Sequence, residues 1–112
     1  MKPSLKKLSE VIAQGNDLFY EKSSSIDTVI GIMDKSLRQQ GMNADAISID
    51  CIPLNKKIVF LIHDIKPQQV DIAFGNKTGD IDATLQLKLT DLTSVKIVEL
   101  MQNYFNELNT ND

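Results

Sequence analysis

The sequence has one cysteine, one histidine, one arginine and no tryptophan among its 112 residues. Because Cys51 is alone, an internal disulfide and a zinc site built from cysteines are both excluded. The longest uninterrupted apolar run extends from Ile58 to Ile62, whereas a membrane-spanning helix needs roughly 20 apolar residues. The lysines near the N-terminus are not followed by the apolar core of a signal peptide. We therefore expect a cytoplasmic protein that does not bind membranes.

Basic and aromatic residues are too scattered for a general nucleic-acid surface. The net charge is −3, and residues 45 to 112 hold ten acidic side chains against six basic ones. Phosphate binding depends on clustered Lys and Arg, and base stacking depends on exposed aromatic rings among them. We expect no nucleic-acid partner. The acidic half would suit a basic protein partner, although mild acidity is also common in proteins that have no such partner.

Composition and length indicate one globular domain of the α+β class over residues 1–112. Hydrophobic residues make up 42% of the chain and charged residues 24%, which is typical of a folded domain. The expected element order is α-α-β-β-β-β-α. The expected parts are a helical hairpin at 1–41, an antiparallel sheet at 46–89, a C-terminal helix packed on one face at 91–108, and a frayed tail at 109–112.

Apolar residues at helical spacing predict the two N-terminal helices. Gly15 lowers helix stability by about 1 kcal/mol relative to Ala and is a candidate break in the first helix. The second helix is predicted to end at Gly41, a C-terminal cap. The apolar stripes are Leu5, Leu8, Ile12, Gly15 and Phe19 in the first helix, and Ile26, Val29, Ile30, Met33 and Leu37 in the second.

Alternating apolar and polar residues predict four strands, at 46–52, 57–63, 70–75 and 81–89. The connections are too short for crossover helices, so the sheet is predicted to be an antiparallel meander. A two-residue turn at Leu54 and Asn55 would place Ile49 opposite Phe60. A turn over 76–79 would place Ile72 opposite Ala83. In both hairpins the apolar side chains then share one face.

The second predicted strand is apolar on both of its sides. Val59 and Leu61 point away from the core set, and with Ile52 they would form an apolar patch on the face that no helix obviously covers. Such patches often mark a partner or ligand surface; the alternative is that another part of the chain covers this one. Tyr104 and Leu108 of the last helix are further candidates for a homodimer contact.

No residue pattern in the chain is typical of a known catalytic or cofactor motif. Cys51 and His63 fall far apart on opposite faces of the predicted hairpin, so they are not expected to form a dyad. The turn at 75–79 contains glycines and a lysine, and is interpreted as a hairpin turn rather than an anion site. We expect no cofactor and no bound metal.

The function predicted from these features is binding or regulation through protein contacts, by a non-enzymatic protein that forms a homo-oligomer. Two alternatives remain open. One is an enzyme that uses Asp64, Asp80 and Asp82, converging at a sheet edge as a cation site or as acid and base. The other is a carrier of an apolar small molecule in a cavity between helices and sheet, lined by Phe19, Met33, Phe74, Met101 and Phe105.

Two stretches carry a pattern-level resemblance to known proteins. The residues at 70–75 and 81–92 resemble the last strand and the following helix of sterol-carrier-type lipid-binding domains. This likeness covers under a quarter of the chain, includes no diagnostic residue and implies a bound lipid. In size and in its mixture of helix and strand, the chain also resembles small acidic secretion chaperones, which implies a protein partner.

Overall fold

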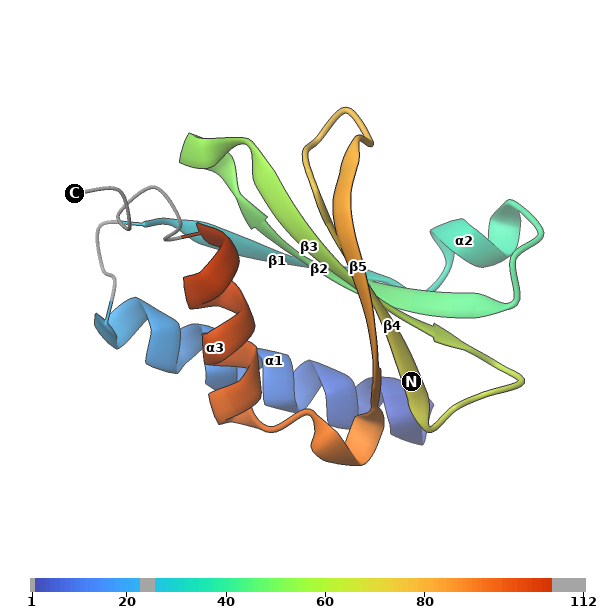
Figure 1. The fold of residues 1–112 in the computed structure, drawn as a ribbon. Coiled ribbons are helices and arrows are strands. Elements are labelled where there is room, and N and C mark those ends of the chain that lie inside the picture. Colours follow the sequence, from blue (N-terminus) through green and yellow to red (C-terminus); the bar gives the residue numbers. More distant parts are fainter. Residues whose placement is uncertain (1, 23–25, 106–112) are drawn as a thin grey trace.

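The computed structural model describes residues 2–22 and 26–105. The described residues form three α-helices and one strongly curved sheet (Figure 1). The helices and strands, in chain order, are α1 (Pro3–Lys22), β1 (Thr28–Met33), α2 (Ser36–Gln39), β2 (Ala44–Cys51), β3 (Lys56–His63), β4 (Gln69–Gly75), β5 (Ile81–Lys88) and α3 (Ser94–Phe105). Two 3₁₀ turns, at Ile52–Leu54 and Leu89–Asp91, follow β2 and β5.

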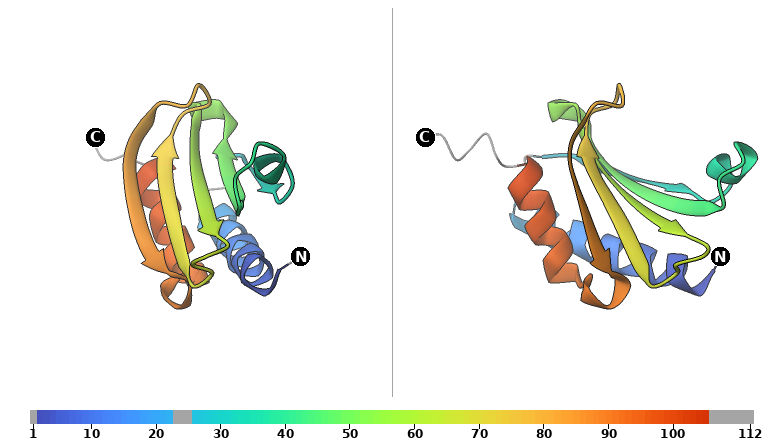
Figure 2. Two further views of the ribbon diagram at one scale, coloured as in Figure 1. Left: turned by 90° about the vertical axis from the view of Figure 1, so that its right-hand side faces the viewer. Right: turned by 45° about the vertical axis from the view of Figure 1, so that its right-hand side comes forward.

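The five strands form one antiparallel sheet in the order β1-β2-β3-β4-β5, so β1 and β5 are its edges. The helices α1 and α3 pack against each other and cover one face of the sheet (Figures 1 and 2). The short helix α2 lies at one end of the opposite face, which has no long helix over it (Figure 2). No described helix is both long and apolar enough to cross a membrane.

The core lies between the sheet and the two long helices. The stripe predicted for the first helix is confirmed, since Leu5, Leu8, Ile12, Gly15 and Phe19 are all buried. The sequence left open whether this helix breaks at Gly15, and the structure shows no break, because α1 continues through it to Lys22. A Cβ atom on Gly15 would overlap the side chain of Ile97. The glycine therefore permits the close approach of α3 at this point.

The α+β class, the antiparallel sheet and the C-terminal helix are confirmed, but the helical hairpin at 1–41 and the count of four strands are wrong. The second predicted helix is instead β1 followed by the single turn α2. Thr28, Val29, Ile30 and Ile32 are β-branched, and Gly31 disfavours a helix interior, so the local preference is for a strand. Pairing with β2 then completes the hydrogen bonds of this segment.

The boundaries of the other predicted elements also shift. The sheet begins with β1, well before residue 46, and its last strand ends at Lys88 because a 3₁₀ turn follows. The final helix begins at Ser94 instead of residue 91. Its predicted end at 108 and the predicted tail at 109–112 lie outside the described residues.

Both predicted hairpins form, but each register differs from the prediction by two residues. Ile49 pairs with Ile58 instead of Phe60, because a four-residue connection ending at Asn55 replaces the two-residue turn. Ile72 pairs with Leu85 instead of Ala83 for two reasons. Gly75 pairs with Ile81, so the connection has five residues instead of four, and a β-bulge between this pair and Phe74–Ala83 adds the second residue. A shift of two residues keeps side chains on their predicted face; the exceptions lie at the bulge, where Ile81 pairs with Gly75 by a shift of one residue. The predicted division of the sheet into a core face and an outer face is therefore unaffected by the error in register.

Candidate functional site

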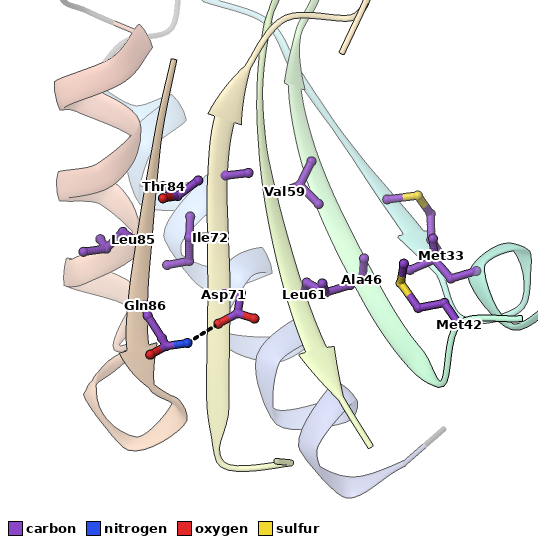
Figure 3. A pocket seen from close by; sticks show the side chains of 12 residues that line it. Met33, Met42, Ala46, Val59, Leu61, Asp71, Ile72, Thr84, Leu85 and Gln86 are labelled. Carbon is purple, nitrogen blue, oxygen red and sulfur yellow. Dashed lines mark hydrogen bonds between the residues drawn. The ribbon is translucent and has the colours of Figure 1, made fainter. Parts of the chain in front are cut away.

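A groove of about 680 Å³ lies on the sheet face opposite α1 and α3. It runs across the strands from the α2 end to β5, as Figure 3 shows. Its lining residues are Met33, Leu37, Met42, Ala46, Val59, Leu61, Asp71, Ile72, Ala73, Thr84, Leu85 and Gln86.

The floor of the groove consists of outward-pointing side chains from the three central strands. In the registers of the sheet, Ala46 of β2 lies beside Leu61 of β3, and Val59 of β3 lies beside Ala73 of β4. Two of these four residues are alanines, so the floor is hollow where the side chains are short. Val59 and Leu61 remain partly exposed. An apolar floor that no helix covers is the main feature of this face.

One wall of the groove comes from β1 and the segment around α2. Met33 ends β1, Leu37 lies in α2, and Met42 follows it (Figure 3). The Met42 side chain is 43% exposed. Methionine side chains are flexible and polarizable, so they adapt to apolar surfaces of different shapes. This wall can therefore adjust to an occupant better than the floor can.

A single arginine ties the α2 wall to the sheet. Arg38 donates from Nε and Nη2 to both carboxylate oxygens of Asp45, at 3.0 and 2.8 Å. It also donates from Nη1 and Nη2 to Asp64, each at 2.8 Å. Lys2 adds a bond of 2.7 Å to Asp64. We call Arg38, Asp45 and Asp64 the arginine clamp.

The clamp changes the pKa values of Asp64 and Arg38. The hydrogen bonds from Arg38, and then from Lys2, hold the pKa of Asp64 well below its usual range. The hydrogen bonds to Asp64 and Asp45 raise the pKa of Arg38 above its already high value. Asp45 is only 5% exposed, so its carboxylate needs this partner. Arg38 and Asp64 are accordingly both charged at neutral pH.

The end of the groove near β5 is polar. Gln86 donates from Nε2 to Asp71 Oδ1 at 2.7 Å (Figure 3), and His63 Nε2 lies 3.4 Å from Asp71 Oδ2. Thr84 adds a hydroxyl to the same end. Among the described residues that line the groove, Asp71 has the one charged side chain. The groove thus combines an apolar length with a single acidic end.

The residues predicted as an apolar patch and interface fall in different places. Val59 and Leu61 lie together on the groove floor. Ile52 lies in the 3₁₀ turn after β2, 48% exposed and away from the groove lining, so it does not join them. Tyr104 is only 9% exposed, and its hydroxyl donates to Asp82 and to the carbonyl of Gly75. Leu108 lies outside the described residues.

The three carboxylates proposed for an enzyme do not converge. Asp64 follows the last residue of β3 and belongs to the arginine clamp, whereas Asp80 and Asp82 lie at the start of β5. The strand registers place the start of β5 level with the first residues of β3, with β4 between them. Seven residues at about 3.3 Å each separate the two ends of β3 by roughly 23 Å. No cluster of three metal-ligating side chains occurs among the described residues.

The other sequence candidates have structural roles. Cys51 is buried at one end of the β2–β3 hairpin, and His63 lies at the other end. Burial raises the pKa of the Cys51 thiol, which makes it a poor nucleophile. In the turn at 75–79, the Asn76 carbonyl accepts from Gly79 and its side chain accepts from Thr78 and Asp80. These backbone donors therefore point at Asn76 and not at an anion.

The five residues proposed to line a lipid cavity are divided between the two faces of the sheet. Phe19, Met101 and Phe105 are fully buried between helices and sheet, and the rings of Phe19 and Phe105 meet edge to face with centroids 6.1 Å apart. Phe74 packs on Tyr104 in the same layer. Met33 lies on the opposite face, in the groove wall. The set does not line one cavity.

The two-sided apolar character of residues 57–63 was the signal that pointed to the groove floor. The helical spacing of the apolar residues at 26–41 places Met33 and Leu37 in the core stripe of a helix, so it does not predict the groove wall. The alternation Thr28, Ile30, Ile32 against Val29 and Met33 would have shown the strand and its outward methionine. Fold and site together define an α+β protein with an apolar groove on an open sheet face. No protein-family model, curated protein or solved structure matches the chain.

Proposed function

We propose that this protein is a binding module whose groove takes an amphipathic helix from a partner protein. The observation that carries the proposal is the apolar groove of about 680 Å³ on the sheet face that α1 and α3 leave open. Apolar surface of this kind favours association when a partner removes it from water. The scattered Asp64, Asp80 and Asp82 argue against the enzymatic alternative.

The dimensions of the groove suit a short helix. The lining residues extend from Met33 on β1 to Gln86 on β5, across four strand-to-strand steps. At about 4.8 Å for each step, the span is roughly 19 Å. A helix rises 1.5 Å per residue, so about 13 residues would fill this length. The expected apolar anchors recur at i, i+3 or i+4, and i+7.

The chemistry of the groove also fits a helix that is apolar on one side only. Because the floor lies on an uncovered sheet face, a bound segment would keep its outer side in water. A helix with one apolar side and one polar side fits both the apolar floor and the water outside it. A lipid chain in the same place would leave apolar surface exposed to water. Asp71 at the β5 end would pair with a Lys or Arg near one end of the helix.

A model peptide tests the proposal. The probe is a fluorescein-labelled peptide of 13 residues with leucines on one helical face, lysine at one end and glutamine elsewhere. We expect fluorescence anisotropy to show saturable binding to the wild-type protein. Replacing Val59 and Leu61 together by Ser removes apolar groups from the floor, and should weaken binding at least about tenfold.

The control variant is Val95→Ser, which makes the same change as Val59→Ser on α3, at a position that is 66% exposed and outside the groove lining. It should bind the peptide as the wild type does, and circular dichroism should show both variants folded. Equal binding by the floor variant and the wild type would contradict the proposal. Binding of a fluorescent fatty acid at the floor, with no binding of the peptide, would favour a small-molecule carrier instead.

A further inference from the structure

We infer that the partner helix inserts a lysine into a polar notch beside the groove, where Ser48 and Asp50 of β2 accept hydrogen bonds from its ammonium group. The notch consists of these two side chains and the open space above Gly31 of β1. The inference rests on the proposed function, and it names a second basic residue of the partner in addition to the one that would pair with Asp71.

The notch lies on the same face of the sheet as the groove floor. In the registers of the sheet, Ser48 lies between Gly31 of β1 and Val59 of β3, and Val59 belongs to the floor. Asp50 follows Ser48 by two residues, so it lies on the same face about 7 Å further along the strand. The flexible four-carbon stem of a lysine can cover this distance from a helix on the floor.

The space above Gly31 exists because this residue has no side chain. A Cβ atom there would lie 3.1 Å from Ser48 Oγ, which is closer than ordinary contact. Apart from the chain neighbours of Gly31, no other atom of the described structure lies within 4 Å of that point. The Ser48 hydroxyl therefore borders an open space on the outer face.

Both polar side chains of the notch lack a partner among the described residues. Ser48 is only 7% exposed, and its hydroxyl makes no hydrogen bond there. Asp50 is partly exposed, but its Oδ1 atom is buried without a hydrogen-bond partner. Lys57 lies opposite Asp50 in the register and forms no ion pair with it. Because a partly buried carboxylate without a donor is unfavourable, a bound cation would stabilise it.

The acceptors of the notch suit an ammonium group better than a guanidinium group. Arginine binds a carboxylate best through two parallel hydrogen bonds, as Arg38 does with Asp45. In the notch, one oxygen of Asp50 is buried, so such a paired contact is blocked. Lysine carries three donors on a compact charge, and can therefore bond to the other carboxylate oxygen and to the Ser48 hydroxyl together.

The notch and Asp71 lie on different strands along the length of the groove. Asp71 is on β4, whereas the notch is formed by β1 and β2. A helix that crosses the strands would meet the notch toward one end and Asp71 toward the other. The expected partner is therefore a helix with a basic residue near each end of its apolar side.

Two peptides test the inference. One is the 13-residue probe with a single lysine, and the other is the same peptide with lysine at both ends. We expect the wild type to bind the two-lysine peptide about fivefold more tightly in fluorescence anisotropy. Asp50→Asn removes the charge with little change of shape, so it should bind both peptides equally. Gly31→Ala keeps the charge but fills the space, and should also lose the preference.

The control variant is Asp27→Asn, which removes the same charge from an exposed residue just before β1. It should keep the fivefold preference, and circular dichroism should show all three variants folded. Equal binding of both peptides by the wild type, or a preference that survives in Asp50→Asn or Gly31→Ala, would overturn the inference and leave the proposed function intact. If neither peptide binds the wild type, the proposed function fails and the inference fails with it.

Discussion

At the scale of single residues, Gly15 shows how a position that weakens a helix can stabilise a fold. We predict that Gly15→Ala destabilises the protein by about 1–2 kcal/mol, because overpacking against Ile97 outweighs the gain in helix propensity. Urea denaturation followed by circular dichroism measures the change. Gln14→Ala, at the exposed neighbouring position, is the control and should not lower stability. A Gly15→Ala variant as stable as the wild type would contradict this packing.

Single residues also show the limits of prediction from the sequence. Alternation alone assigned Val59 and Leu61 to the outer face, because the two-residue period of a strand fixes the face of each side chain. It could not fix the registers, because these depend on the turns. Asn55 adopts a left-handed conformation with φ 52°, and the four-residue connection it closes shifts the β2–β3 pairing by two residues. Nothing in the apolar pattern distinguishes these two registers.

At the scale of elements, α2 is a single helical turn that depends on the arginine clamp for its position. We predict that Arg38→Gln releases this turn and with it the groove wall. The methyl signals of Met33 and Met42 in a ¹³C-methionine NMR spectrum should shift, whereas that of Met101 in the core should not. Lys35→Gln removes the same charge from an exposed site and should leave all three signals unchanged.

The clamp should also respond to acid. Because the pKa of Asp64 is lower in the folded protein than its usual value, the ionised carboxylate favours the folded state above about pH 4. This contribution is lost as the pH falls below 4 toward the lowered pKa. We predict that the Met33 and Met42 signals of the wild type then move toward those of Arg38→Gln. Signals that do not change down to the acid unfolding transition would show that the clamp does not hold the wall.

The segment at 26–41 marks where prediction of elements failed. Its apolar residues fit a helical stripe and also fit a strand with one turn after it, so the periodicity is ambiguous in a short run. The β-branched residues and Gly31 favour the strand locally, but the pairing with β2 decides it, and that contact is not local. For the same reason the methionine wall of the groove could not be predicted, although its floor could.

At the scale of the whole molecule, the groove and the core lie on opposite faces of one sheet. Val59 and Leu61 are partly exposed on the groove face, whereas Ile58 and Phe60 of the same strand are fully buried in the core. We predict that the Val59→Ser, Leu61→Ser variant loses the model peptide but remains folded, because the substituted side chains are not part of the core. Urea denaturation followed by circular dichroism measures its stability, and a variant that is unfolded without urea would contradict this separation of the two faces.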